Sequence, residues 1–127
     1  DKYYGTGIAN AYLGDEDQGQ MSSWFVMAAL GLFQTDGGCR IDPIYEIASP
    51  LYEKVIIDLG ERYNRGKTFT IEAKNVSRKN KYVQSAMLNG KVLNEFFFPA
   101  SELLKGGELI LEMGDKPNTS WGIPTCN

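Results

Sequence analysis

After Pro43 the apolar residues recur with a period of two in a series of short segments, and this pattern constrains the fold more than any other feature of the sequence. The segments are rich in β-branched and aromatic residues, and Asn89-Gly90 between two of them is typical of a type I′ hairpin turn. Short strands, regular turns and no second helical pattern predict a mainly β fold, an antiparallel β-sandwich-like domain. The expected strands are Ile44–Ala48, Tyr52–Leu59, Thr68–Ala73, Tyr82–Leu88, Lys91–Phe98 and Glu108–Met113.

One long apolar α-helix is expected ahead of the sheet, from Gln20 to Phe33. Asp17 is placed to cap it, and Gln20 three residues later would complete an Asp-x-x-Gln capping box. Gly31 and then Asp36-Gly37-Gly38 mark its end. Apolar residues occupy almost every face, which is typical of a helix buried on all sides, whereas a small sheet can cover only one face. We therefore expect the chain to be part of a larger protein that supplies the other neighbours of this helix.

Charge and composition exclude several classes of function. The 127 residues carry a formal net charge of −3 without a basic stripe, so we expect no nucleic-acid partner. The sequence has no histidine, which excludes a Ser-His-Asp triad, a Cys-His pair and any His-ligated zinc site within it. The apolar stretches are too short and too interrupted to span a bilayer. Cys39 and Cys126 belong to no CxxC motif, and both a disulfide between them and two free thiols stay open.

Three consecutive carboxylates, Asp15-Glu16-Asp17, lie between two glycines directly before the predicted helix. Because neighbouring carboxylates repel one another, the partial positive charge of a helix N-terminus or a bound cation must offset the repulsion. In an extended segment Asp15 and Asp17 point to the same side and Glu16 to the opposite side. A pair of ionised carboxylates aimed into a cleft suits the general base that activates water in an inverting glycosidase.

A purely structural interpretation of the same residues is also open. Asp17 as an N-cap, with Asp15 and Glu16 as favourable first-turn charges, would account for all three, and in an arbitrary sequence this is the commoner case. An EF-hand calcium loop is excluded, because Val26 stands where that loop requires a glutamate. Catalysis would also need a general acid from elsewhere, since adjacent residues of one loop cannot easily straddle a sugar.

The run GDEDQGQMSSW from Gly14 to Trp24, followed by AALGLF from Ala28 to Phe33, resembles the glycoside hydrolase family 92 α-mannosidases. Gln18 and Pro99 depart from residues common in that family, but neither alters the aspartate pair. The likeness extends in order over nearly the whole chain and is therefore far more specific than one motif. It continues through Ile47–Leu51, Phe69–Ile71, Asn75, Asn80–Ser85, Leu88–Gly90, Gly106–Leu109, Met113-Gly114, Pro117-Asn118 and Trp121-Gly122.

The resemblance implies the C-terminal part of an exo-acting, inverting, calcium-dependent α-mannosidase that hydrolyses α-mannosidic linkages of N-glycans or mannans. Such enzymes combine a β-sandwich with an (α/α)6 barrel, so residues 1–36 would be the tail end of the catalytic helical barrel, and residues 37–127 a C-terminal β-sandwich-like domain. The expected partners are a mannose-containing glycan and the rest of the parent chain. The protein would be periplasmic or secreted, with its signal in an N-terminal part that precedes this sequence.

Specific roles for the carboxylates also follow from the resemblance. Asp15 and Asp17 match the two aspartates assigned to the general base, and Asp17 is also expected to contact the calcium ion. The family's general acid, a glutamate, would lie well upstream, so we expect the isolated chain to be inactive and its calcium site to be incomplete. Residues that would bind substrate or support the site are Gly14, Glu16 and Gln20.

Two other functions remain open for this chain. It could be a carbohydrate-binding β-sandwich that recognises sugar through exposed aromatic side chains, or a purely structural module that braces the barrel. Three consecutive phenylalanines cannot all face inward on one strand, so at least one is expected to be exposed or to pack on another part of the protein. The aromatic candidates are Tyr82, Phe96, Phe97, Phe98 and Trp121.

Overall fold

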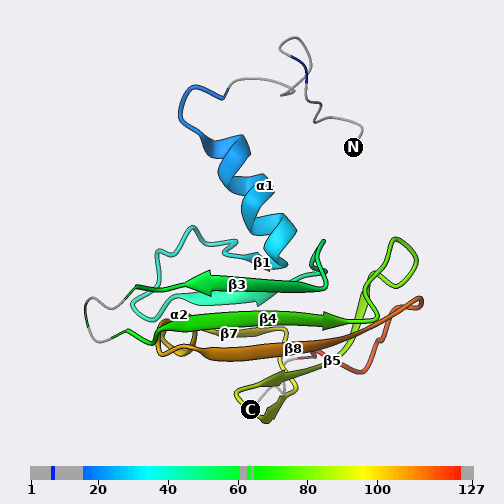
Figure 1. The fold of residues 1–127 in the computed structure, drawn as a ribbon. Coiled ribbons are helices and arrows are strands. Elements are labelled where there is room, and N and C mark those ends of the chain that lie inside the picture. Colours follow the sequence, from blue (N-terminus) through cyan, green and yellow to red (C-terminus); the bar gives the residue numbers. More distant parts are fainter. Residues whose placement is uncertain (1–6, 8–15, 61–62, 64, 124–127) are drawn as a thin grey trace.

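The computed structural model describes residues 7, 16–60, 63 and 65–123, which form two β-sheets and two helices (Figure 1). One sheet has three strands in the order β1-β2-β7, and the other has five strands in the order β3-β4-β8-β5-β6. Strands dominate the described part of the chain. The prediction of a mainly β fold is therefore confirmed.

The small sheet is made of β1 (Leu32–Phe33), β2 (Ile44–Ile47) and β7 (Phe97–Pro99), with antiparallel pairing throughout. The predicted single strand Lys91–Phe98 is wrong, because the chain leaves the large sheet after β6 (Lys91–Leu93) and joins the small sheet only at β7. A strand that changes sheets keeps its apolar residues, so periodicity alone does not reveal the break.

The large sheet contains β3 (Lys54–Asp58), β4 (Thr68–Lys74), β5 (Tyr82–Leu88), β6 and β8 (Gly107–Gly114). The pairing of β4 with β8 is parallel, whereas the other strand pairs of this sheet are antiparallel. The predicted antiparallel arrangement therefore holds for this sheet except at the pair of β4 and β8. Between β5 and β6, Asn89 and Gly90 both have positive φ, 50° and 77°, which confirms the predicted hairpin turn.

A second helix, α2 (Ala100–Leu104), connects β7 to β8, although the sequence predicted no second helix. It has five residues and buries Leu103 in the core. A helix of little more than one turn is too short to display a 3.6-residue period. Parallel strands need a crossover connection, and α2 lies within the one that leads from β4 to β8.

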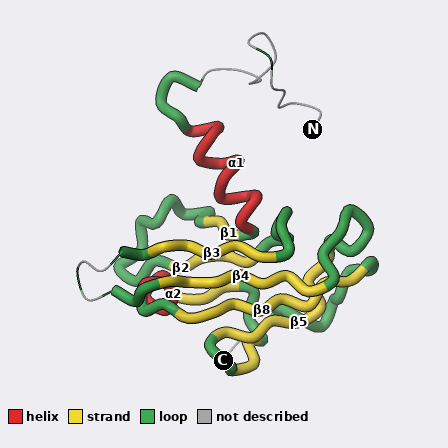
Figure 2. The backbone as a smooth tube through the Cα atoms, in the orientation of Figure 1, coloured by secondary structure: helices red, strands yellow, loops and turns green. Residues whose placement is uncertain are grey.

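The hydrophobic core contains side chains from both sheets, which lie as two layers in Figure 2. Along β4 the buried residues alternate with less buried ones, and Phe69, Ile71 and Ala73 face the core. Phe98 of the small sheet stacks on Phe69, with ring centroids 6.0 Å apart. Fully burying a side chain of this size contributes about 1.5–3 kcal/mol, so this stack is a principal contact between the two layers.

Helix α1 (Gln20–Leu30) ends three residues before the predicted Phe33. Gly31 adopts a left-handed conformation with φ of 76°, and its N–H bonds back to Ala28 and Met27. The next residue, Leu32, already pairs with Ile47 of β2. The tertiary pairing therefore overrides the apolar pattern at the end of the helix.

Helix α1 projects away from the sheets and touches them only at its C-terminal end (Figure 1). Its only buried residue is Ala29, whereas Trp24 is 49% and Val26 is 54% exposed. The sheets therefore cover little of this apolar helix, as expected if its other neighbours belong to a larger protein. The described residues include no (α/α)6 barrel, and the assignment of α1 to such a barrel stays a prediction. None of the helices among the described residues is long and apolar enough to cross a membrane.

Candidate functional site

The predicted site lies where the chain enters α1. Glu16 begins a turn that its backbone closes, since the Gly19 N–H donates to the Glu16 carbonyl oxygen at 2.9 Å. Asp17 and Gln18 form the corner of this turn and are exposed. Gly19 is the N-cap of the helix and has a left-handed conformation, with φ of 71°. The turn therefore presents Asp17 at the surface, directly beside the positive end of the helix.

The Glu16 carboxylate binds the first turn of α1 with both of its oxygens. Oε2 accepts a hydrogen bond from the Met21 N–H at 2.8 Å, and Oε1 accepts one from the Ser22 N–H at 2.9 Å. These N–H groups lack partners within a helix, and the helix dipole favours a negative charge at this end. The hydrogen bond from the Ser22 side chain lowers the pKa of Glu16, partial desolvation acts against it, and the two backbone donors lower the pKa further.

The predicted capping box of Asp17 and Gln20 is wrong. The N-cap residue is Gly19, and the carboxylate that satisfies the helical N–H groups belongs to Glu16. With the left-handed glycine inserted before the helix, the turn brings the longer glutamate side chain back over the first helical N–H groups. A glycine three residues after Glu16 and directly before Gln20, the first residue of the predicted helix, was the sequence signal for this arrangement.

Three of the five predicted site residues are brought together within this turn and the start of α1. Glu16, Asp17 and Gln20 are described, and Gln20 is an exposed first residue of the helix. Gly14 and Asp15 lie outside the described residues, so the pairing of Asp15 with Asp17 stays a prediction.

The calcium ion inferred from the resemblance would need ligands beyond those the structure describes. Calcium takes six to eight oxygen ligands, usually including several carboxylates. Among the described residues, no group of three or more Asp, Glu, Cys or His side chains could hold a metal ion. Asp17 could supply a single carboxylate, and the Glu16 carboxylate is directed at the helix. The described residues therefore do not amount to a calcium site.

The aromatic residues considered for sugar binding are mostly engaged elsewhere. Phe98 is buried in the core, and Phe96 and Phe97 are partly buried, with their rings in an edge-to-face contact at 5.3 Å. The Trp121 indole N–H donates to the Leu93 carbonyl oxygen at 2.9 Å. The Tyr82 ring lies 5.5 Å from the Lys81 ammonium. Only Phe98 of the three phenylalanines is buried, which agrees with the expectation that they do not all face inward. None of them is fully exposed, and packing of Phe96 or Phe97 on another part of the protein stays a prediction.

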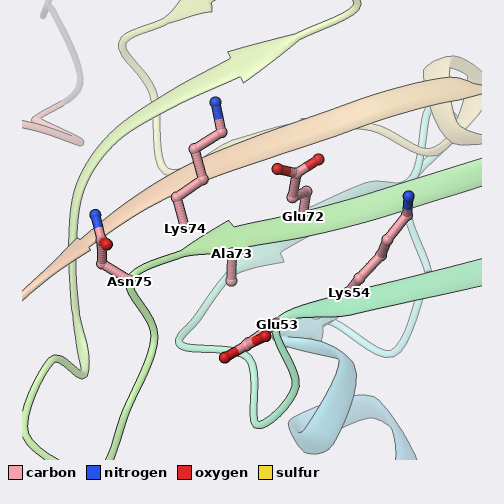
Figure 3. A pocket seen from close by; sticks show the side chains of 6 residues that line it. All are labelled: Glu53, Lys54, Glu72, Ala73, Lys74 and Asn75. Atoms are coloured by element: carbon pink, nitrogen blue, oxygen red, sulfur yellow. The ribbon is translucent and has the colours of Figure 1, made fainter.

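A shallow, open concavity of about 630 Å³ lies at the edge of the large sheet. Figure 3 shows Lys54, Glu72 and Lys74 pointing to one side of the strands there, and Ala73 pointing to the other. Its lining includes no aromatic side chain and none of the predicted site residues. A concavity of this shape does not enclose a ligand as binding pockets do.

The structure shows whether one of the two cysteines, Cys39, forms a disulfide. Cys39 is exposed and free, and Cys126 lies outside the described residues. The structure therefore supports the free-thiol alternative for Cys39, and the state of Cys126 stays a prediction.

Comparison with known proteins shows which protein family this chain resembles. Residues 1–115 match the model of the glycosyl hydrolase family 92 catalytic domain. The chain is also 37% identical over 111 residues to a protein of Arthroderma benhamiae described as an uncharacterized secreted glycosidase. That match covers 86% of this chain but 13% of the relative.

Solved structures of Bacteroides thetaiotaomicron enzymes share the fold. A family GH92 inverting mannosidase is 38% identical, with a TM-score of 0.78 over 95% of this chain and 15% of that enzyme. A family GH92 α-mannosidase, solved in complex with mannoimidazole, is 29% identical, with a TM-score of 0.81 over 97% of this chain and 15% of that enzyme. The chain thus spans about one seventh of the length of the solved enzymes. Sequence and fold agree in placing it in glycosyl hydrolase family 92.

Proposed function

We propose that this chain is part of an exo-acting, inverting α-mannosidase and supplies its general base. The observation that carries the proposal is the family match over residues 1–115, together with the two similar structures, which are both mannosidases. The match includes the carboxylate run before α1, Asp15-Glu16-Asp17, whose residue types suit the activation of water. The substrate would be a glycan with terminal α-linked mannose, as in N-glycans or mannans.

In the proposed reaction, Asp15 and Asp17 act on the water that attacks the anomeric carbon. One carboxylate accepts a proton from this water as its oxygen bonds to the carbon, and the other holds the water in line. A carboxylic acid on the opposite side of the sugar gives a proton to the departing glycosidic oxygen, so the product has inverted configuration. The exposed position of Asp17 at the corner of the Glu16–Gly19 turn suits a group that must meet solvent water.

The general acid is proposed to come from outside this chain. The two carboxyl groups of an inverting glycosidase are about 6.5–9.5 Å apart, and they flank the scissile bond from opposite sides. Residues of a single tight turn cannot take both positions around a sugar. We therefore expect that the chain alone does not hydrolyse mannosides.

Calcium dependence and an extracytoplasmic location complete the proposal. Calcium rests on the resemblance to the family, with Asp17 as the candidate ligand from this chain and the other ligands from outside it. A periplasmic or secreted location is supported by the relative described as a secreted glycosidase.

The decisive experiment replaces Asp15 and Asp17, one at a time, in the full-length enzyme of which this chain is proposed to be a part. Asp15→Ala and Asp17→Ala should each lower kcat by about 10²–10⁴-fold, the usual contribution of general acid–base catalysis. Turnover is measured with a chromogenic α-mannoside, and proton NMR identifies the first anomer released, expected to be β-mannose. Glu102→Ala is the matched control, since Glu102 is an acidic residue in the first turn of the other helix, α2. Near-native kcat in both aspartate variants would refute the assignment of the base.

A carbohydrate-binding or purely structural role is the alternative for the chain by itself. Burial of Phe98 and the hydrogen bond of Trp121 to the backbone speak against an aromatic sugar platform. Calorimetric titration of the isolated chain with mannose oligomers should give no heat at millimolar sugar. A saturable heat would favour the binding function instead.

A further inference from the structure

We propose that Glu16 is a positioning residue, which fastens the turn carrying Asp17 to the first turn of α1 and thereby holds Asp17 in one orientation for the reaction. The proposal rests on the proposed function, in which Asp17 belongs to the general base. It assigns Glu16 no contact with substrate, although the sequence left substrate binding and site support equally open for this residue.

Three backbone N–H groups donate hydrogen bonds to Glu16, in addition to the Ser22 side chain. Its carbonyl oxygen accepts from the Gly19 N–H, and its two carboxylate oxygens accept from the Met21 and Ser22 N–H groups. The first bond closes the turn, and the other two fix that turn against the helix. Asp17 is the residue directly after Glu16, so these bonds restrict the backbone from which its side chain projects.

The direction of the Glu16 side chain separates its role from that of Asp17. Both of its oxygens are directed at backbone N–H groups of α1, and Glu16 is only partly exposed. Asp17, at the corner of the turn, is exposed. The two consecutive carboxylates therefore have different roles. Glu16 binds backbone N–H groups of α1, whereas Asp17 is exposed.

Packing within this chain does little to order the turn. The described residues from Glu16 to Gln20 include no buried side chain, so packing contributes little to their order. A general base must nevertheless be placed accurately, because a misplacement of about 1 Å can cost about 10²-fold in rate. Supporting hydrogen bonds commonly provide this accuracy where packing does not.

The test is made in the full-length enzyme that contains this chain. It compares the variants Glu16→Ala and Glu16→Gln with the unmodified enzyme. The alanine variant removes both side-chain acceptors, whereas the glutamine variant is isosteric and keeps one oxygen acceptor of the two. With a chromogenic α-mannoside, Glu16→Ala should lower kcat by about 10²-fold and leave KM within about twofold. Glu16→Gln should fall between the alanine variant and the unmodified enzyme. A residue that contacts substrate in the ground state would instead raise KM.

Glu102→Ala provides the matched control for the loss of a first-turn glutamate. Glu102 lies in α2 and pairs with Lys105, and its removal should leave both kinetic constants unchanged. A kcat within about twofold of the unmodified enzyme in Glu16→Ala, or a rise in KM alone, would overturn the positioning role. If the alanine variant fails to fold, the same criteria applied to Glu16→Gln decide the question.

The aspartate variants distinguish a failure of this inference from a failure of the proposed function. Loss of activity in Asp17→Ala together with native kinetics in Glu16→Ala would overturn only the positioning role. Native activity in Asp17→Ala would refute the base assignment itself, and the positioning role would fall with it.

Discussion

Asp36 shows at the scale of single residues how local hydrogen bonds tune a carboxylate of this chain. Its Oδ1 accepts from the Gly38 N–H at 2.9 Å, and its Oδ2 accepts from the Arg40 Nε. The Gly38 N–H is the largest cause that lowers the pKa of Asp36 from its ordinary value of 3.8, partial desolvation opposes it, and Arg40 lowers it further. The turn formed by Asp36-Gly37-Gly38 was expected from the sequence, but the contact with Arg40 was not.

Because the pKa of Asp36 is lowered in the folded state, this carboxylate stabilises the fold in its ionised form. Its contribution is present above the ordinary pKa of 3.8 and is lost as the pH falls through the lowered folded value. Carboxyl NMR titration should give an Asp36 midpoint below 3.8, and Arg40→Ala should move it upward without restoring the ordinary value. Lys67→Ala, in which an exposed lysine is removed, is the control. An Asp36 midpoint at or above the ordinary value would contradict the prediction.

Position 31 can be occupied without strain only by a glycine. Its φ is +76°, and a Cβ added there would lie 2.8 Å from the Pro50 Cγ and 2.9 Å from the Ala48 carbonyl oxygen. Gly31→Ala should therefore destabilise the fold by more than the roughly 1–2 kcal/mol that a left-handed conformation costs an ordinary residue. Urea unfolding measures this difference. Gly37→Ala is the matched control, with φ of +63° but no atom within 4 Å of the added Cβ. Equal losses in the two variants would show that the close contacts at Gly31 carry no cost.

At the scale of elements, β7 contributes one buried side chain, Phe98, to the core between the two sheets, in addition to Leu32 of β1 and Ile47 of β2. Phe98 is 1% exposed and stacks on Phe69 of β4. Phe98→Ala should lower the free energy of unfolding by about 3–5 kcal/mol, because it removes a large buried ring and leaves a cavity. Val92→Ala, at a position 71% exposed in β6, should change it by less than about 0.5 kcal/mol. Similar changes in both variants would mean that the stack does not hold the layers together.

The bounds of a strand could be predicted where a local sequence pattern determines them. They could not be predicted where pairing with a distant strand determines them. The alternation in Thr68–Lys74 and the Asn89-Gly90 turn identified β4, β5 and the start of β6 with nearly correct bounds. The break before Phe97 and the parallel pairing of β4 depend on partners distant in the sequence, which periodicity does not report. The capping by Glu16 was missed for a different, local reason, since it depends on the left-handed conformation of Gly19.

At the scale of the whole molecule, α1 leaves an apolar surface uncovered in this chain. Trp24, Phe25 and Val26 are between 43% and 54% exposed on a helix that projects from the sheets (Figure 2). Exposed apolar surface of this kind favours association. We expect the chain expressed alone to self-associate in sedimentation velocity as its concentration rises. Val26→Lys should weaken this association, whereas Val92→Lys on the large sheet should not. A chain that stays monomeric at all concentrations would contradict the expectation.

The order of strands in the large sheet has a consequence for how the protein is made. Of its five strands β8 comes latest in the sequence, yet it lies between β4 and β5 and pairs with both. During synthesis the β3–β4 and β5–β6 pairs emerge first, each with an open edge of unpaired backbone groups. The edges of β4 and β5 stay unpaired until β8 (Gly107–Gly114) leaves the ribosome. Every growing chain therefore passes through a stage in which two strand edges that can pair with other chains are exposed at the same time.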